Sequence, residues 1–216
     1  MKCLVTAGPT YEPLDQVRRL TNFSTGHLGI ELANFLTNRG HDVVLLLSES
    51  ASYQGERQAR EVITFSTTHD LEQKLAAFSG GNLGAVFHAA AVSDFAFGKI
   101  WSRPAAGALE EIKSGKIATR DGALLAELVP TPKIIQRLRA WFPEAKLVGW
   151  KYEVEGDRDR VRRAAEAQLR ECRTDACVVN GPGYGAGFGL VTGANEWMAW
   201  ATREALFAAL TRDFAS

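Results

Sequence analysis

The sequence predicts a three-layer α/β/α sandwich around a Rossmann-like, mostly parallel sheet, built as a single domain over residues 1–216. Three observations lead to this prediction. Apolar runs of strand length alternate with amphipathic stretches along the whole chain, as they do in repeated β-α units. The run DVVLLLS at 42–48 is apolar on nearly every residue, which is typical of a parallel strand covered on both faces. The chain has 216 residues, 46% of them hydrophobic, which favours one well-filled core.

The expected strands are short runs rich in aliphatic and β-branched residues. They cover 2–7, 42–48, 62–66, 84–95, 123–130, 146–154, 175–181 and 196–202. The first helix carries a stripe of Leu28, Leu32, Phe35 and Leu36 and ends at Gly40. Further helices are expected over 69–78, 131–142, 157–173 and 204–214, with a proline in the first turn of the helix at 131–142. Irregular structure is expected over 96–122 and 181–193.

The charge balance argues against a protein that binds nucleic acid or a membrane. Lys and Arg number 25, and Asp and Glu also number 25, so no overall field attracts a polyanion. Small anionic substrates are still allowed, because a few well-placed cations are enough to bind them. No apolar run approaches the length of a membrane span and the start MKCLV is too short for a secretory signal, so we expect a cytoplasmic protein.

The cysteines and histidines do not indicate a metal site. Cys3, Cys172 and Cys177 lack the spacing of zinc ligands, and the four histidines are dispersed along the chain. Cys3 and Cys177 lie in apolar runs, as small core residues of a reducing compartment do.

A long segment between the first strand and the first helix is the most unusual feature. Residues 10–25 hold two acids, two adjacent arginines and an asparagine, whereas such connections usually take about 2–6 residues. In sheets of this kind, ligands bind beyond the carboxyl ends of the strands. Segments 8–29, 89–95, 113–116 and 180–195 lie at or after expected strand ends, so we expect them to form a site at one edge of the sheet.

The common nucleotide-binding motifs are absent. The sequence has no G-x-G-x-x-G, no G-x-x-x-x-G-K-[ST] and no Tyr-x-x-x-Lys pair, although Glu49 at a strand end could meet a ribose hydroxyl. An NAD(P)-dependent oxidoreductase and a P-loop hydrolase are therefore disfavoured. The stretch STGHLG is a better candidate, because Ser24 or Thr25 can cap the following helix while Gly26 leaves its N–H groups open to a phosphate. A simply well-capped helix is the alternative.

In order and spacing, the segments at the sheet edge resemble the motifs of the phosphopantothenoylcysteine synthetase family. TAGPTYEPLDQVRRLTNFSTGHLG is similar to T-A-G-[GP]-T-x-E-P-[IL]-D-x-V-R-x-[IL]-[ST]-N-x-S-[ST]-G-x-x-G. AAAVSDF resembles A-A-V-[AS]-D-[YF], and ELVPTPKII resembles L-x-x-T-P-D-I. LVGWKYEVEG resembles V-G-F-A-A-E-T or the eukaryotic-type S-F-K-L-E-T-D, and DACVVNGPGYGAGFG with ANEW resembles the closing D-x-[IV]-[VA]-A-N…F-G…N-E pattern.

The resemblance implies a two-step ligase of coenzyme A biosynthesis. The carboxylate of 4'-phosphopantothenate attacks the α-phosphate of a nucleoside triphosphate, CTP or ATP, and pyrophosphate leaves. The amine of cysteine then attacks the acyl-nucleotide, and the nucleoside monophosphate leaves. Mg²⁺ and lysines are expected to offset the crowded negative charge. Family members are typically homodimers whose active site is completed near the subunit interface.

The resemblance also implies the catalytic residues. Asn22 matches an asparagine that contacts the acyl-nucleotide, Arg18 an arginine that holds a carboxylate or phosphate, and Lys113 a lysine on a flap that neutralises phosphates. The residues alone allow plainer interpretations. Asn22 can cap the helix, and Arg18 can form a surface ion pair with Glu12 or Asp15.

The residues expected to bind the nucleotide come from the same motifs. They are Gly8, Ser24, Thr25, Gly26, Ala90, Ala91, Asp94, Lys116, Pro132, Ile134 and Trp150. Ala90 and Ala91 are small enough for a ligand to approach, Asp94 matches an acid that contacts the nucleotide, and Trp150 has an aromatic position suited to stacking on the base. The respective alternatives are packing of small residues, a turn cap and a buried core tryptophan.

Several positions depart from the family pattern. Tyr11 replaces an arginine, His27 replaces a lysine, and Gln168 and Cys172 replace two helical lysines that help bind the nucleotide in bacterial members. A catalytically weakened nucleotide- or phosphopantothenoyl-binding protein is therefore the second hypothesis, and an NAD(P)-binding oxidoreductase is the third. The segment WKYE is closer to the eukaryotic type, which favours ATP, while bacterial types use CTP, so both nucleotides stay open. The decarboxylase domain often fused upstream is absent from the sequence, so we expect a free-standing synthetase.

Overall fold

A large sheet forms the centre of the molecule. The computed structural model describes residues 1–103, 107–112, 115–117, 123–193 and 196–215. The sheet has eight strands, and its order is β13 (Trp197–Trp200), β12 (Phe188–Thr192), β11 (Ala176–Asn180), β10 (Lys146–Tyr152), β6 (Ala85–His88), β1 (Lys2–Ala7), β4 (Asp42–Ser48) and β5 (Glu61–Phe65). All neighbours from β11 to β5 are parallel, whereas β12 and β13 continue the sheet antiparallel. This order confirms the predicted mostly parallel sheet.

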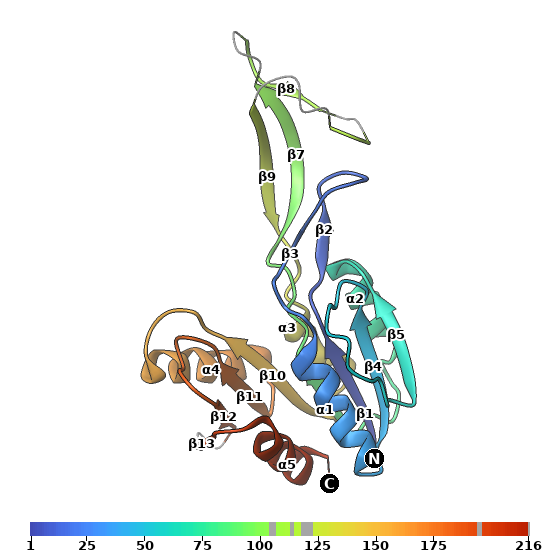
Figure 1. Ribbon diagram of the computed structural model, residues 1–216, viewed down its shortest axis with the longest axis vertical. Helices are drawn as coiled ribbons and strands as arrows, with labels where there is room; N and C mark the ends of the chain where they lie inside the picture. The colour runs from blue at the N-terminus through green and yellow to red at the C-terminus, as the bar shows by residue number, and fades with distance from the viewer. Residues whose placement is uncertain (104–106, 113–114, 118–122, 194–195, 216) are drawn as a thin grey trace.

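Helices cover both faces of this sheet (Figure 1). α1 (His27–Asn38) and α5 (Arg203–Phe214) share one core cluster, whereas α2 (Thr68–Ala77) and α3 (Ile134–Trp141) contribute to a second. α4 (Arg158–Cys172) packs with β11 and β12 in a third cluster. Alternate residues of one strand belong to opposite faces, as side chains on a pleated strand must. The three-layer arrangement of the prediction is thereby confirmed.

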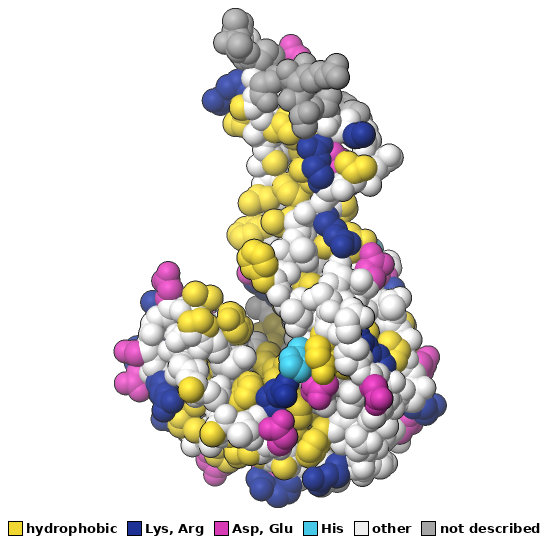
Figure 2. Space-filling model, in the orientation of Figure 1, with side chains coloured by type: hydrophobic (Ala, Val, Ile, Leu, Met, Phe, Trp, Pro, Cys, Tyr) yellow, Lys and Arg dark blue, Asp and Glu magenta, His cyan; other side chains and the backbone are white. Residues whose placement is uncertain are grey.

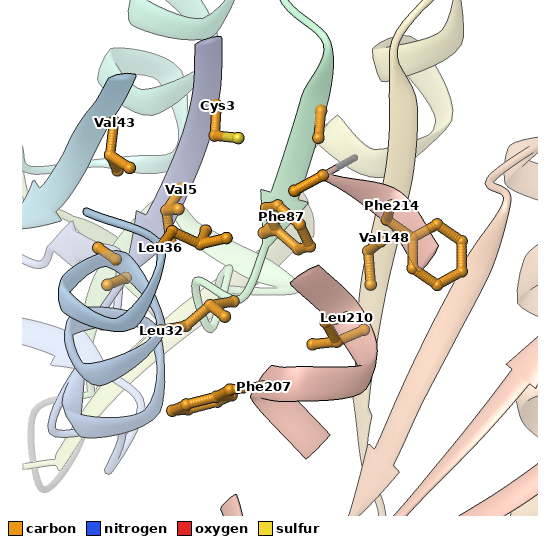
Figure 3. Packing of buried hydrophobic residues seen from close by; sticks show 14 of the residues in the cluster. Cys3, Val5, Leu32, Leu36, Val43, Phe87, Val148, Phe207, Leu210 and Phe214 are labelled. Atoms are coloured by element: carbon orange, nitrogen blue, oxygen red, sulfur yellow. The ribbon is translucent and has the colours of Figure 1, made fainter. Parts of the chain in front are cut away.

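The core under α1 and α5 is centred on Phe87 of β6. Phe87 is fully buried, and its backbone neighbours across the sheet are Val5 of β1 and Val148 of β10. Figure 3 shows both helices on the same side of this row, with Leu36 of α1 next to Phe87 and Phe207 of α5 pointing toward α1. A dry contact surface of this kind supplies most of the free energy that holds such a fold together.

A three-stranded arm projects from the body (Figure 1). β7 (Phe95–Arg103) pairs antiparallel with β8 (Glu110–Glu111) and β9 (Ala123–Pro130) in a separate sheet. The expectation of irregular structure from residue 96 was therefore wrong for the length of β7, and the strand expected at 123–130 lies outside the central sheet. Most residues of both long strands are at least partly exposed, and the register shifts between Phe97 and Ile100, so neither strand shows a buried face in its sequence.

Smaller differences from the prediction lie next to the site. The long first connection contains a hairpin of β2 (Tyr11–Pro13) and β3 (Arg19–Thr21). β6 ends at His88 rather than continuing to residue 95, and the stretch expected to be an irregular loop contains β12. α3 begins at Ile134, so Pro132 precedes the helix instead of lying in its first turn. Within the part of the chain that the structure describes, no helix has the length and apolarity to cross a membrane.

Replacement of Phe87 by Ala is expected to lower the free energy of unfolding by about 3–5 kcal/mol, because it leaves a cavity in the centre of the sheet. Denaturant unfolding followed by circular dichroism measures this change. Val62→Ala, at a position on β5 that is 40% exposed, is the control and should change the stability by less than about 0.5 kcal/mol. Equal effects of the two substitutions would contradict the position given to Phe87.

Candidate active site

A cleft of about 1170 Å³ lies at the carboxyl ends of β6, β10 and β11. Its walls come from the segment before α1, the loop after β6, the start of α3, one side of α4 and the start of α5. Figure 2 shows the surface hollowed at the foot of the arm, between the α4 side and the α1 side of the body. The cleft therefore occupies the edge of the sheet at which the sequence predicted a site.

The cleft brings together most of the residues that the sequence analysis singled out. Those that line it are Asn22, Ser24, Thr25, Gly26, Ala90, Ala91, Asp94, Pro132, Ile134 and Trp150. Gly8, Arg18 and Lys116 are not among its lining residues. Lys113 lies outside the described residues.

The start of α1 forms one wall, and two glycines shape it. Gly8 and Gly26 have φ values of 87° and 80°, a conformation that other residues rarely adopt. A Cβ on Gly26 would lie 3.4 Å from the Cα of Gly8, so the two backbones are in contact. Gly8 therefore shapes the wall from behind, without lining the cleft itself.

The N-cap of α1 is Gly26, so the expectation that Ser24 or Thr25 occupies the cap was wrong. The Thr25 hydroxyl instead accepts the N–H of His27 at 3.3 Å. Within the described structure, no side chain caps this helix and no acid lies in its first turn. The partial positive charge of the helix N-terminus is thus open to an anion in the cleft.

Asn22 is held against the loop after β6. Its Nδ2 donates to the carbonyl oxygen of Ala91 at 3.0 Å. Because this contact is to the neighbouring loop and not to the backbone of α1, Asn22 is not the helix cap that the sequence allowed. One hydrogen of the amide nitrogen is left for a ligand.

The loop after β6 is attached to β1 by a buried hydroxyl. Thr6 Oγ1 accepts the N–H of Ala90 at 3.1 Å and lies 2.9 Å from Nδ1 of His88. Burial lowers the pKa of His88 from 6.5 to about 4, so this histidine is neutral at physiological pH. The sequence analysis had assigned it no role, although it lines the cleft.

Three cations that the sequence analysis did not assign line the cleft: Lys133, Lys151 and Arg203. Arg203 Nη1 donates to Nε2 of His27 at 2.6 Å, and the His27 ring stacks on Tyr53 with 4.0 Å between ring centroids. Lys133 and Lys151 belong to segments quoted for their resemblance, TPKII and WKYE, which was the one signal that could have indicated them. Arg203 had no signal, because its place depends on how α5 packs.

Arg18 lies in the turn between β2 and β3, where it has structural contacts. Its Nη2 lies 2.5 Å from the Asp15 carboxylate and also donates to the carbonyl oxygen of Ile117 at 2.8 Å. The Arg18 guanidinium, together with backbone N–H donors, holds the pKa of Asp15 well below its usual range. The ion pair considered from the sequence therefore exists with Asp15, while Glu12 instead accepts the N–H of Thr68.

Trp150 lies between the cleft and the core. It lines the cleft, and its ring also packs against the core cluster under α1 and α5. Its Nε1 is buried and has no hydrogen-bond partner among the described residues. The ring is thus held in place by packing alone.

The carboxylates of the cleft suit a metal ion that arrives with phosphate groups. Asp94 and Glu171 line it, and no cluster of three or more potential metal ligands occurs in the described ranges. Mg²⁺ usually binds through one or two carboxylates together with substrate phosphates. These two acids fit that pattern and do not fit a metal held by protein alone.

Glu49 does not support a dinucleotide site. It accepts the hydroxyl of Tyr11 at 2.7 Å and lies 3.9 Å from Arg19. It is also not among the residues that line the cleft.

Comparisons with known proteins agree on one family. The profile of the DNA/pantothenate metabolism flavoprotein C-terminal domain matches residues 1–206. The chain is 35% identical over 179 residues to the coenzyme A biosynthesis bifunctional protein CoaBC of Thermococcus kodakarensis. The aligned region covers 83% of this chain and 41% of that protein. The chain is 31% identical over 189 residues to CoaBC of Mycobacterium tuberculosis, which covers 87% of this chain and 43% of that protein. The chain thus spans about two-fifths of the length of these relatives.

Solved structures share the fold over the whole chain. The DNA/pantothenate metabolism flavoprotein of Streptococcus pneumoniae has a TM-score of 0.85 at 25% identity, covering 100% of this chain and 98% of that one. The complex of the Cab2 mutant H337A with phosphopantothenate-cysteine has a TM-score of 0.72 at 19% identity, covering 99% of this chain and 86% of that one.

Acidification is expected to destabilise the protein through His88. Its pKa is lowered in the folded state, so the unfolded chain binds more protons between pH 6.5 and about 4, and stability falls as the pH falls through this window. The loss between pH 7 and pH 5 should be about 2 kcal/mol. Denaturant unfolding at both pH values measures it. In His88→Gln the loss of unfolding free energy between pH 7 and pH 5 should be smaller than in the wild type by about 2 kcal/mol. An equal loss in both proteins would show that His88 is not its cause.

Proposed function

This chain belongs to the family of DNA/pantothenate metabolism flavoprotein C-terminal domains, and on that premise we propose that it joins 4'-phosphopantothenate to cysteine through an acyl-nucleotide intermediate. Two similarities support the proposal: relatives are coenzyme A biosynthesis bifunctional proteins, and a protein of the same fold was solved with phosphopantothenate-cysteine. The observation that carries it is the convergence of Asn22, the loop of Ala90 and Ala91 and the uncapped start of α1 in one cleft.

The reaction needs an electrophile, because a carboxylate does not react with an amine directly. A carboxylate oxygen of 4'-phosphopantothenate forms a bond to the α-phosphorus of the nucleoside triphosphate, and the bond to pyrophosphate breaks. The cysteine nitrogen then bonds to the activated carbonyl carbon, the nucleoside monophosphate leaves with the electron pair of the broken C–O bond, and the nitrogen loses a proton.

The residues of the cleft provide donors at both steps. The open N-terminus of α1 receives a phosphate group through its N–H groups. The free amide hydrogen of Asn22 donates to the oxygen on which charge develops, and its contact with Ala91 fixes the direction of that donor. Trp150 lies where it can stack on the base, which is that of CTP or ATP.

Mg²⁺ bound to the phosphates supplies charge neutralisation in this proposal, with Asp94 and Glu171 as the carboxylates at hand. Two of the substrates, 4'-phosphopantothenate and the nucleoside triphosphate, are small anions, and the zero formal net charge of the sequence favours such ligands over nucleic acid. The cytoplasm is the proposed location.

Loss of the Asn22 side chain is expected to abolish most of the activity. Asn22→Ala should lower pyrophosphate release in the presence of 4'-phosphopantothenate, cysteine and CTP or ATP by about 100-fold or more. The control is Asn34→Ala, because Asn34 lies on α1 and binds the Glu56 carbonyl oxygen away from the cleft. No pyrophosphate release by the wild type with either nucleotide would refute the ligase. Nucleotide binding without acyl-nucleotide formation would favour the weakened binding protein suggested by Gln168 and Cys172.

A homodimer is the second part of the proposal, since Arg18 does not line the cleft of its own chain. Apolar side chains are exposed on the hairpin, on the segment after it and on the arm, where Figure 2 shows them gathered. They are Val17, Leu20, Phe23, Phe95, Leu109, Leu124 and Leu128. Exposed apolar surface of this extent is typical of an interaction site. We propose that a second copy covers it and that Arg18 of one subunit reaches the cleft of the other.

Mixing two inactive variants tests this arrangement. If Arg18 and Asn22 act from different subunits, a mixture of Arg18→Ala and Asn22→Ala chains forms hybrid dimers with one intact site. The expected activity is about a quarter of the wild-type value after random exchange of subunits. Arg39→Ala mixed with Asn22→Ala is the control, because Arg39 follows α1 and stacks on Phe35 away from the cleft. Monomers in analytical ultracentrifugation, or no recovery in the mixture, would contradict the shared site.

A further inference from the structure

Two lysines line the part of the cleft that faces α3 and α4. Lys133 is the N-cap residue of α3, and Lys151 lies near the end of β10. Gln168, Glu171 and Cys172 of α4 line the same part. A lysine at the start of α3 and a lysine of β10 therefore both line the cleft beside α4.

The electrostatics of Cys172 on α4 agree with the position of the two lysines in the cleft. Burial raises the pKa of the Cys172 thiol, and Glu171 raises it further. The positive charges of Lys151 and Lys133 both oppose this rise, as expected for lysines that line the cleft together with Cys172.

The geometry of β10 agrees with this placement of Lys151. Side chains two residues apart on a strand point to the same face of the sheet. A Cβ built on Gly149 would lie 2.5 Å from Nε2 of Gln168 and 2.8 Å from Ile135. Lys151 follows Gly149 by two residues, so its side chain starts from the face that α3 and α4 cover.

Both lysines are held by carboxylates that a phosphate can displace. Lys133 forms an ion pair with Asp94, and the two side chains are 57% and 65% exposed. Lys151 Nζ lies 3.5 Å from Glu153. The Lys151 and Glu153 side chains are 37% and 27% exposed. An exposed pair such as Lys133–Asp94 contributes about 0–1 kcal/mol. A nucleoside triphosphate carries several negative charges and competes well against one carboxylate.

The cleft has no cation on α4 itself, because its lining residues there are Ala164, Ala167, Gln168, Glu171 and Cys172. We propose that Lys133 and Lys151 bind the phosphate groups of the nucleoside triphosphate and take the place of the two lysines that this helix lacks. This inference rests on the proposed ligase function and adds two nucleotide-binding residues to it.

Binding of CTP and ATP by titration calorimetry tests the proposal without turnover. Lys133→Gln and Lys151→Gln should each raise the Kd of the better-bound triphosphate about tenfold, as the loss of a charge-assisted contact does. The Kd of the corresponding monophosphate should rise less, because fewer charges are involved. Lys146→Gln is the matched control, since Lys146 is exposed at the opposite end of β10 and should leave both values unchanged. Thermal unfolding checks that all variants are folded.

A second variant moves the charge back to α4. Gln168→Lys in the Lys151→Gln background should reverse at least half of the increase in log Kd for the triphosphate, because Gln168 lines the same wall. Wild-type affinity in both single variants, or an equal loss in Lys146→Gln, would overturn the inference while the ligase stands. A wild-type protein that binds neither CTP nor ATP would overturn the ligase as well.

Discussion

The carbonyl oxygen of Ala91 is the acceptor on which the arrangement of the cleft depends. It receives the N–H of Thr10 at 3.1 Å and Nδ2 of Asn22 at 3.0 Å, which uses both of its lone pairs. The N–H of Ala91 donates in turn to the carbonyl oxygen of Gly8 at 3.0 Å. The connections after β1 and after β6 are therefore bound to each other through Ala91. Asn22 is one of the two donors to this oxygen, so the contacts that join the two connections also fix the position of its side chain.

Two threonines extend this attachment and explain how a loop of small residues is ordered. Thr6 Oγ1 accepts from Ala90, and Thr10 Oγ1 accepts the N–H of Ser93 at 2.8 Å; both threonine side chains are fully buried. Ala90 packs against the core under α2 and α3, but an alanine buries little apolar area, so the buried hydrogen bonds add to what holds the loop. The small side chains then leave the volume of the cleft free for a ligand.

Sequence patterns predicted the central sheet well, because its strands are buried on both faces. A strand buried on both faces has a nearly continuous apolar run, such as 42–48. The arm was missed because β7 and β9 bury few residues, and burial is what creates a period in the sequence. In the same way, local motifs placed Asn22 and Ala91 at the sheet edge. They could not show that Arg203 lies beside the start of α1, which depends on contacts between elements 176 residues apart.

The arm and the hairpin also decide what Arg18 can do. The Asp15 carboxylate accepts the N–H of Ile117 at 3.2 Å, and Arg18 donates to the carbonyl oxygen of the same residue, so the pair joins the hairpin to the arm. These contacts use Nε and Nη2 of the guanidinium, whereas Nη1 has no acceptor among the described residues. The side chain as a whole is 36% exposed. An Arg18 that holds the arm through Nε and Nη2 thus keeps Nη1 for the anion that the proposed shared site would bring to it.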